Sequence, residues 1–348
     1  RSTLFPYTTL FRSGRRNFIV CKPNGMPMTV SISPMLAIKY STAVAPPPRS
    51  NQTILPINLM FSAHLSFSTV QIYDIFVPSQ QMRFIIDAET MSYLTQRHFI
   101  TYHLLETHPE IIAFSTTRHG GCSKGTYATF NCTVHGGDSE KHAARNLHAL
   151  SRLFPEPPKA FVIPHQCHRD SICLVNTPDI PSELEGIDAV VTAVPRICAC
   201  VSTADCVPVL LYDPVKKVVA AVHSGWRGTV IRIVETVIQT MRQHYACDAK
   251  DILACIGPSI SVDAFEVGDE VYEAFRNAGF DMNTIARHDE KWHIDLWEAN
   301  RQILSDQGVG EGHTEISGIC TYTHSEDFFS ARRLGNRSGR ILNGIMLL

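Results

Sequence analysis

Three short segments of the sequence place histidine, cysteine and aspartate side chains beside apolar runs. They span residues 164–169, 202–208 and 221–228. Each lies at the edge or end of a predicted strand, where rigid scaffolds usually carry their functional side chains. These segments are therefore the first candidates for a metal-binding or catalytic site.

One ligand from each segment makes a donor set suited to Zn²⁺: His168, Cys206 and His223. Zn²⁺ prefers imidazole and thiolate ligands, and three protein ligands leave a fourth position open for water or substrate. Spacing alone does not bring these side chains together. His165 competes with His168 as the ligand of the first segment, and each residue taken singly is more often a structural core residue.

If residues 197–206 form one extended strand, two further thiols, Cys198 and Cys200, lie on the same face as Cys206. Residues two apart on a strand are separated by about 6.6 Å. Two Zn–S bonds of about 2.3 Å bridge that gap poorly. Cys206, at the strand end, is therefore the preferred thiolate, and the other two are interpreted as small buried hydrophobic residues.

The elements that must position these residues are short apolar strands and a few helices. The predicted strands span residues 111–117, 187–193, 197–203, 207–212, 217–223, 251–256 and 341–348. Their continuous apolar character predicts strands covered on both faces. The predicted helices span residues 139–153, 229–244, 269–277 and 295–305. An apolar stripe in the second helix predicts a core-facing surface, formed by Val230, Ile233, Val234, Val237 and Met241.

Composition and motifs exclude several classes of protein. With 31 basic and 33 acidic residues, the chain lacks the basic excess of a dedicated nucleic-acid binder. Its longest uncharged stretch, residues 50–73, is too polar to span a membrane. Eleven cysteines without a credible signal peptide predict free thiols in a reducing, cytoplasmic compartment. Phosphate-loop, H-E-x-x-H and G-x-S-x-G motifs are absent from the sequence.

The first 81 residues differ in kind from the rest. They hold seven basic residues and one acidic residue, nine of the 20 prolines and two of the 20 glycines. Residues 3–13 match the in-frame translation of a common sequencing adapter. We therefore interpret residues 1–81 as a non-native or disordered extension, although a basic transit peptide and a genuine disordered tail are alternatives. A single domain over residues 82–348 follows, with Met60, Met82 and Met91 as candidate starts.

The motifs around the candidate ligands resemble one known family. They are Gln166-x-His168, Thr203-Ala204-Asp205-Cys206-x-Pro208 and His223-Ser224-Gly225-Trp226-Arg227-Gly228. This combination resembles the purine nucleoside phosphorylases also called laccase-domain or polyphenol oxidoreductase proteins of the YfiH type. Further matching motifs lie at residues 119–127, 131–138, 256–260, 265–267, 320–321 and 328–333. The resemblance covers about residues 83–348.

The resemblance implies a fold, a metal and an activity. The implied fold is a single-domain, layered α/β sandwich with mixed sheets, of the mixed α+β class. The implied zinc ligands are His168, Cys206 and His223. The implied reactions are phosphorolysis of adenosine, inosine, guanosine and methylthioadenosine, giving a base and a pentose 1-phosphate, and deamination of adenosine. The expected partners are purine nucleosides and phosphate, with no nucleic acid or membrane, for a monomer or homodimer.

Individual residues receive expected roles under this hypothesis. Asp205 or a histidine would move protons, and Arg227 would bind phosphate through its planar donor fork. Asn131 and His135 would hold the ribose or the base. As alternatives, Arg227 makes a surface ion pair and Asp205 a structural hydrogen bond to the following turn, while Trp226 more often packs a helix start than stacks on a purine.

Other positions limit these assignments. Three residues depart from the family pattern, namely Arg169, Ser224 and Cys132. The charge of Arg169 beside a candidate ligand makes the substrate preference less certain than metal binding. Arg332 and Arg333 would either neutralise acidic neighbours or attract phosphate.

Two other functions compete with nucleoside chemistry. The first is a copper-dependent polyphenol oxidoreductase, but such multicopper enzymes use H-x-H pairs, and the 16 histidines here include none. The second is a non-enzymatic metal-binding module, for which an open coordination position would be superfluous.

Overall fold

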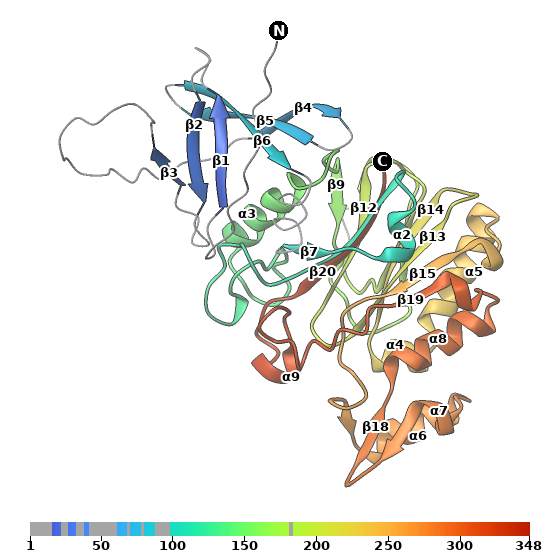
Figure 1. Cartoon of the computed structure of the whole chain (residues 1–348). Helices are drawn as coiled ribbons and strands as arrows, with labels where there is room; N and C mark the ends of the chain where they lie inside the picture. The colour runs from blue at the N-terminus through green and yellow to red at the C-terminus, as the bar shows by residue number, and fades with distance from the viewer. Residues whose placement is uncertain are drawn as a thin grey trace. The chain divides into compact units, whose positions relative to one another are not determined.

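The computed structural model describes residues 98–180 and 184–348, together with the backbones of six strands within residues 16–87 (Figure 1). Contacts along the chain divide it into two units, Arg1–Leu94 and Thr95–Leu348. The boundary expected at residue 81 and the non-native or disordered character of residues 1–81 stay predictions. Of the candidate starts, Met60 and Met91 lie outside the described residues.

The strands of the first unit form one antiparallel sheet in the order β3-β2-β1-β6-β5-β4. Their bounds are Arg16–Cys21 for β1, Pro27–Ile32 for β2, Ile38–Ser41 for β3, Phe61–Phe67 for β4, Val70–Val77 for β5 and Gln80–Asp87 for β6. Strand β6 therefore runs across the boundary expected between residues 81 and 82.

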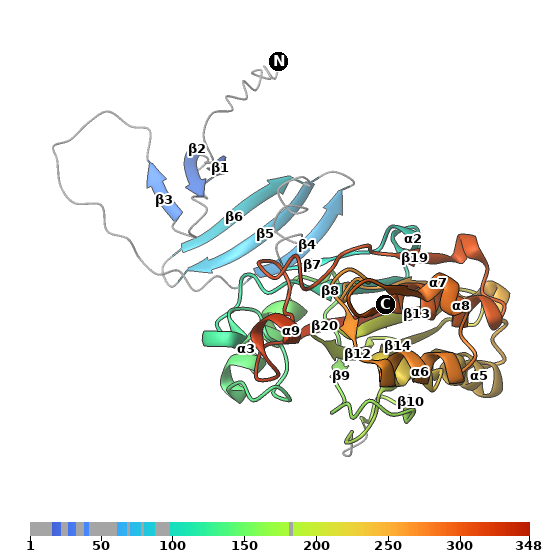
Figure 2. The ribbon, with the colours of Figure 1, turned by 90° about the horizontal axis from the view of Figure 1, so that it is seen from below.

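The second unit is built on two larger sheets (Figures 1 and 2). The five-stranded sheet has the order β7-β8-β20-β12-β9, formed by Phe99–Ile100, Ile111–Thr116, Ile341–Leu347, Ile197–Thr203 and Ala160–Val162. The six-stranded sheet has the order β10-β11-β14-β13-β15-β19, formed by Ile172–Val175, Ala189–Thr192, Val218–Ser224, Val207–Asp213, Leu253–Ile256 and Thr314–Ile316. Both sheets mix parallel and antiparallel pairs.

The two sheets pack face to face, and helices cover their outer faces. Alternate residues of one strand face different layers: Leu210 of β13 lies between the sheets, while Val209 faces the helices. Helices α5 (Ile233–Tyr245) and α8 (Leu296–Asp306) pack on the six-stranded sheet, and α3 (Glu140–Ser151) packs on the five-stranded sheet. The layered α/β sandwich with mixed sheets is therefore confirmed, because each apolar strand is covered on both sides.

The predicted helix over residues 229–244 is instead two helices. Helix α4 (Trp226–Val230) ends before Arg232, whose backbone is left-handed with φ of 59°, and α5 then begins at Ile233. The Arg232 guanidinium donates to Glu235 and to Asp306, both at 2.6 Å. One local contact and one contact to α8 thus accompany a conformation that helix periodicity does not reveal. The predicted apolar stripe is otherwise correct, since its members in α5 are fully buried.

Many elements of two to four residues were not predicted, because such runs carry too little periodicity. They include a small sheet with the order β16-β18-β17, formed by Glu266–Val267, Trp292–Ile294 and Ala286–His288. Short helices lie at His103–Glu106 (α2), Met282–Ile285 (α7) and Ala331–Leu334 (α9), and the longer α6 spans Asp269–Asn277, as predicted. Short 3₁₀ helices lie at Gly125–Tyr127, Ala249–Asp251 and Glu311–His313.

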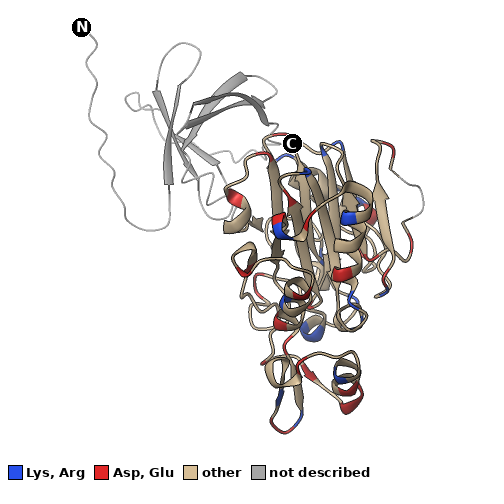
Figure 3. Ribbon diagram, turned by 90° about the vertical axis from the view of Figure 1, so that its right-hand side faces the viewer, with Lys and Arg blue, Asp and Glu red and all other residues tan. Residues whose placement is uncertain are grey.

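The surface of the second unit carries both signs of charge. Acidic and basic residues are interspersed over its ribbon (Figure 3). Within residues 98–180 and 184–348, every helix is too short or too polar to cross a membrane. The ten cysteines of this part of the chain are free thiols, and Cys198 and Cys200 are fully buried, as predicted.

Candidate active site

Strand register brings the three candidate ligands to one end of the sandwich. Cys206 lies in the turn between β12 and β13, and His223 lies near the end of the neighbouring strand β14. Because Pro208 pairs with His223 in this ladder, the turn lies directly beside that histidine. His168 lies in the loop between β9 and β10. Strand β9 pairs with β12 in the five-stranded sheet, and β10 is an edge strand of the six-stranded sheet.

The three side chains form a compact cluster. One ligand atom from each of His168, Cys206 and His223 lies within 4.8 Å of the others. The Cys206 Sγ is 3.7 Å from the His168 Nε2, and the two imidazole rings lie edge to face with centroids 4.7 Å apart. Ligands of tetrahedral zinc are separated by about 3.3–3.6 Å, for bonds of about 2.0–2.3 Å. The donor types and their spacing therefore fit one zinc ion.

A fully buried carboxylate, Asp188, joins the two histidines. Its Oδ1 accepts a hydrogen bond from the His223 Nδ1 at 2.7 Å and from the His168 backbone N–H at 2.9 Å. Its Oδ2 accepts the backbone N–H groups of Cys167 and Arg169, at 3.2 and 2.8 Å. Because the His223 Nδ1 carries the donated proton, its Nε2 is left to face the metal position.

Charges within the cluster shift its titration. Burial raises the pKa of the Cys206 thiol, but the positive charge of His223 and hydrogen bonds from the two histidines outweigh it and lower the value to about 6. Burial lowers the pKa of His223, but Cys206 and Asp188 together raise it to about 9. The cluster therefore favours a thiolate, which is the form of cysteine that binds metals.

The backbone is strained at His168 and at the residue before Cys206. His168 and Asp205 adopt left-handed conformations, with φ of 60° and 85°. Such conformations cost about 1–3 kcal/mol and persist where surrounding contacts determine them. Asp188 supplies those contacts to His168, and the Asp205 carbonyl accepts the Ile260 N–H at 3.0 Å.

The competing histidine, His165, is placed differently. Its Nδ1 lies 2.7 Å from the Glu185 carboxylate, and its ring stacks on His135 with centroids 4.7 Å apart and planes at 12°. His135 is exposed, next to the exposed side chain of Val134. The stacked pair therefore presents an aromatic surface, while His168 is the histidine of this loop that contacts Cys206.

Two residues with expected chemical roles are engaged in structural hydrogen bonds. The Asp205 carboxylate accepts from the Thr321 hydroxyl at 2.7 Å and from the Arg332 backbone N–H at 2.6 Å. Asn131 is fully buried, and its amide donates to the Thr133 carbonyl and to Asp138, at 2.7 and 2.9 Å. The Asp205 carboxylate thus bonds to segments distant in the sequence rather than to the following turn, and Asn131 has a positioning role.

The candidate phosphate-binding arginine, Arg227, is exposed at the first turn of α4. Its guanidinium lies over the Trp226 ring, 4.2 Å from the centroid, and within the described residues it makes no ion pair. Trp226 itself packs partly against the core below α4, as the more common role of such a residue predicts. Arg227 therefore keeps donors available for an anion.

The guanidinium groups of the two α9 arginines contact a backbone carbonyl, a hydroxyl and two aromatic rings. The Arg332 guanidinium lies 3.3 Å from the Glu266 backbone carbonyl and 5.6 Å from the Phe265 ring centroid. Arg333 lies over the Tyr322 ring, 4.5 Å from its centroid. Both side chains are exposed, and both contacts anchor the segment that follows Cys320.

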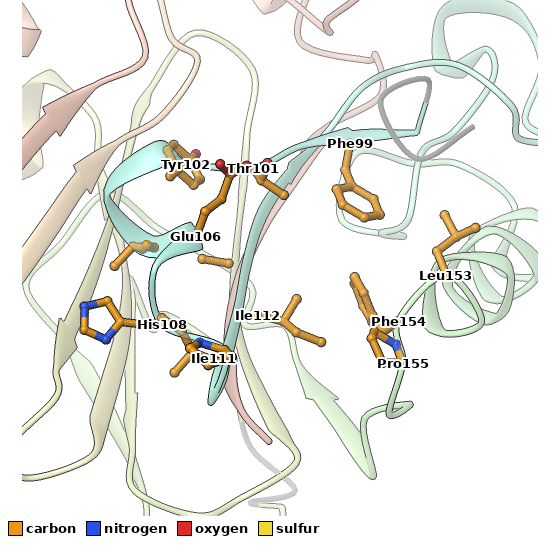
Figure 4. A pocket seen from close by; sticks show the side chains of 13 residues that line it. Phe99, Thr101, Tyr102, Glu106, His108, Ile111, Ile112, Leu153, Phe154 and Pro155 are labelled. Atoms are coloured by element: carbon orange, nitrogen blue, oxygen red, sulfur yellow. Dashed lines mark hydrogen bonds between the residues drawn. The ribbon is translucent and has the colours of Figure 1, made fainter. Parts of the chain in front are cut away.

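Two cavities lie apart from the ligand cluster. One, of about 220 Å³, lies between α2 and the end of α3 and is mostly apolar, with Phe99, Tyr102 and Phe154 among its walls (Figure 4). The other, of about 630 Å³, is lined by His119 and Asp327, whose side chains are 2.8 Å apart. Neither contains a predicted site residue.

Sequence reasoning overlooked Asp188 as a functional residue. Its signal was a charged residue between Ile187 and the apolar residues of a buried strand, where an unpaired carboxylate would be costly.

The departure at Ser224 also has a structural explanation. Its buried hydroxyl contacts the Thr229 hydroxyl and donates to Asn300, at 3.0 and 2.8 Å, which ties α4 and α8 to the end of β14.

Fold and site together define a layered α/β sandwich with a two-histidine, one-cysteine cluster at one end of its sheets. The chain belongs to the family described as multi-copper polyphenol oxidoreductase laccase, whose model matches residues 112–348.

Named relatives and solved structures agree with this membership. The chain is 46% identical over 267 residues to a purine nucleoside phosphorylase of Bacteroides thetaiotaomicron, covering 74% of this chain and 99% of the relative. It is 40% identical over 244 residues to adenosine deaminase RL5 from an unknown prokaryotic organism, covering 67% and 92%. The crystal structure of hypothetical protein YfiH of Bacillus licheniformis is 29% identical with a TM-score of 0.68, covering 72% of this chain and 97% of that one.

Proposed function

We propose that this protein is a zinc-dependent purine nucleoside phosphorylase that also deaminates adenosine. The observation that carries the proposal is the His168, Cys206 and His223 cluster, whose three donors leave one position of a tetrahedral ion for substrate or water. Relatives named purine nucleoside phosphorylase and adenosine deaminase support the choice of substrate class. The proposed nucleosides are adenosine, inosine, guanosine and methylthioadenosine.

A zinc ion bound here would polarise a substrate oxygen and lower the pKa of a water molecule. The protein's own residues have the task of orienting its ligands. Asp188 fixes the tautomer of His223 and holds the His168 loop through backbone N–H groups. Because the hydrogen bonds from His223 and Arg169 lower the pKa of Asp188 despite its burial, this carboxylate stays ionised in that role.

In phosphorolysis, a phosphate oxygen forms a bond to the ribose C1′ as the bond from C1′ to the purine nitrogen breaks. The base leaves with a proton, and the pentose carries the phosphate. The Arg227 guanidinium, which is exposed and stacked on Trp226, would bind the attacking phosphate. The exposed face of His135 would contact the ribose or base, and Asn131 would hold the backbone around it.

In deamination, the oxygen of water adds to the purine carbon that carries the amine, and ammonia leaves. A proton must move from the water to the departing nitrogen. Since both Asp205 oxygens already accept hydrogen bonds, a histidine of the site is the better candidate for this transfer.

Copper-dependent oxidation of phenols is the second candidate, which the family description favours. Multicopper enzymes assemble several metal ions from many histidines. In residues 98–180 and 184–348, one cluster of three potential ligands is formed, and one of its ligands is a thiolate. A non-enzymatic metal-binding module is the third candidate. We further propose that the enzyme acts in the cytoplasm, as a monomer or homodimer.

Metal analysis combined with product assays separates these functions. Purified protein is tested for zinc and copper, then incubated with adenosine or inosine, with and without phosphate, and assayed for adenine, hypoxanthine and ammonia. Bound zinc and phosphate-dependent base release support the proposal. Copper-dependent phenol oxidation would support the second candidate, and metal retention without any turnover would support the third.

Replacing either Cys206 or His223 tests the assignment of the site. Cys206→Ala or His223→Ala should lower nucleoside turnover below detection and remove bound zinc, because two remaining ligands hold the ion poorly. Circular dichroism should show a folded protein in both variants. Wild-type turnover in either one would refute the assignment.

A further inference from the structure

Arg340 lies beside the ligand cluster, although no feature of the sequence singled it out. It directly precedes β20, which pairs with β12 so that Ile341 lies opposite Thr203. Continuing this antiparallel register places Arg340 next to Ala204, at the start of the turn that carries Asp205 and Cys206. Strand pairing therefore delivers a guanidinium to the end of the sandwich where the metal ligands converge.

The backbone around Arg340 also contacts the loop that holds the predicted substrate-binding residues Asn131 and His135. Its backbone N–H donates to the Asn131 side-chain oxygen at 3.0 Å. Ser338, two residues before Arg340, lies so close to Gly136 that a Cβ at Gly136 would be 2.7 Å from the Ser338 carbonyl oxygen. Arg340 thus connects the turn of Cys206 with the loop of His135, and Asn131 holds it there.

Three backbone carbonyls hold the guanidinium on one side. Its Nη1 donates to the carbonyls of Ser338 and Gly339, at 2.7 and 3.1 Å, and its Nη2 donates to the Asn336 carbonyl at 2.9 Å. Of its five N–H groups, the Nε–H and one Nη2–H have no acceptor among the described residues. Nε and Nη2 share one edge of a guanidinium, and an N–H from each makes a fork that can bind phosphate through two parallel hydrogen bonds.

The charge of Arg340 is not neutralised by a contacting acid. Among the ion pairs of the described residues, none includes Arg340, and its side chain is half-buried. Burial lowers the pKa of Arg340, while the nearby negative charges of Cys206 and Asp205 raise it. Both Asp205 oxygens accept hydrogen bonds from other residues. The carboxylate therefore attracts the Arg340 guanidinium electrostatically without occupying its free N–H donors.

The other arginines around the site are less suited to hold an anion against the cluster. The guanidinium groups of Arg332 and Arg333 lie over aromatic rings on the exposed side of α9. Arg227 is exposed on Trp226, so its phosphate contact would be weakened by water. Arg340 is the half-buried cation of this group, and a rigid, carbonyl-held guanidinium loses little freedom when it binds.

We propose that Arg340 forms an oxyanion subsite of the active site and binds the phosphate that attacks the nucleoside. This assignment rests on the proposed phosphorolysis and deepens it by naming the residue that receives the second substrate. Arg227 would then guide phosphate from the surface, while Arg340 holds it beside the ligand cluster.

The test compares Arg340→Gln and Arg340→Lys with a matched control, Arg337→Gln. Arg337 is an exposed arginine of the same loop, and its backbone carbonyl, which the substitution keeps, accepts from Thr126. For each zinc-loaded protein, the KM for phosphate, the KM for inosine, phosphate-free deamination of adenosine and the zinc content are measured. Calorimetric titration with inorganic phosphate measures binding directly.

The expected result separates phosphate binding from the rest of the site. Arg340→Gln should raise the KM for phosphate roughly 10- to 100-fold, because two charge-assisted hydrogen bonds are lost. Deamination, zinc content and the KM for inosine should stay within about twofold, and the lysine variant should fall between, since it keeps the charge without the fork. Arg337→Gln should behave as wild type.

Two outcomes would overturn the proposal. An unchanged KM for phosphate in Arg340→Gln would show that the anion binds elsewhere. An equal loss of deamination, inosine affinity and zinc would show that Arg340 only holds the loop.

If the wild type shows no phosphorolysis, the proposed function fails, and the calorimetric titration still decides the subsite. Phosphate binding that is lost in Arg340→Gln supports the subsite. Phosphate binding that is absent in the wild type, or equal in both proteins, refutes it.

Discussion

At the scale of single residues, the candidate site depends on one buried carboxylate as much as on its three proposed metal ligands. Asp188 accepts four hydrogen bonds, which fix both a histidine tautomer and the backbone of a strained loop. Such supporting groups typically change metal affinity by about 10- to 100-fold when they are replaced.

Asp188→Asn should therefore weaken zinc binding by about 10- to 100-fold. An amide cannot accept hydrogen bonds at both of its atoms, and it carries no charge to support the imidazole. Competition with a chromogenic chelator measures the change. Asp170→Asn, an exposed aspartate in the same loop, is the control and should bind zinc as wild type. Equal affinity in both variants would contradict the role of Asp188.

The titration of Cys206 and His223 predicts how metal affinity depends on pH. Before a metal binds, the pKa of Cys206 is about 6 and that of His223 is about 9. Between these values the cysteine is already a thiolate, and His223 carries one extra proton that the metal must displace.

Zinc affinity should consequently rise by about tenfold per pH unit from pH 6 to 9 and then level off. Below pH 6 the dependence should steepen, because the thiol proton must be displaced as well. Chelator competition at several pH values, in a buffer that does not bind zinc, gives the slope. A flat profile over this range would show that the thiolate–imidazolium pair does not form.

At the scale of elements, the first turn of α4 lies against two of the proposed metal ligands. Gly225, the N-cap of α4, has no side chain, and a Cβ there would lie 3.0 Å from both the Cys206 Sγ and the His168 Cδ2. The close approach of helix and cluster thus favours glycine at this position, even though its φ of −64° is open to any residue.

Gly225→Ala should displace both ligands by a few tenths of an ångström and lower zinc affinity by about tenfold, because metal geometry tolerates little change. Gly228→Ala is the matched control. Its Cβ would meet its nearest atoms at 3.4 Å, an ordinary contact, and alanine favours the helix by up to about 1 kcal/mol. Chelator competition and thermal melting of both variants provide the comparison, and a wild-type affinity in Gly225→Ala would rule out the steric argument.

At the scale of the whole molecule, the family match and the candidate site fall within one unit. The match covers residues 112–348, and contacts place the unit boundary between Leu94 and Thr95. Both large sheets, their covering helices and every candidate ligand belong to the unit Thr95–Leu348.

A protein lacking residues 1–81, or one beginning at Thr95, should retain nucleoside turnover, zinc content and melting temperature. The reason is that the hydrophobic core of this unit lies between its two sheets and between each sheet and the helices that cover it. Activity assays and differential scanning calorimetry on the shortened proteins provide the measurement. A melting temperature lowered by many degrees would show that the removed segment belongs to the fold.

Much of the fold could be predicted from short stretches of sequence. The strands β12 and β13 begin at the predicted residues, and α6 matches its predicted bounds, because composition and periodicity record such elements locally. The predicted helix across Arg232 was wrong in its continuity, because ion pairs to Glu235 and Asp306 set the left-handed break. The shortest strands were missed, because neighbouring strands, more than their own residues, determine them.

The sequence by itself determined the donor chemistry of the site, since imidazole, thiolate and guanidinium groups are properties of residues. Only the tertiary structure decided which of them meet. Cys206 and His168 are 38 residues apart, and Asp205 and Thr321 are 116 apart, so strand register and loop conformation set their contacts. The support from Asp188 and the position of Arg340 beside Cys206 follow from the same register. A one-residue slip of a strand would turn its side chains to the opposite face, and local sequence does not encode that choice.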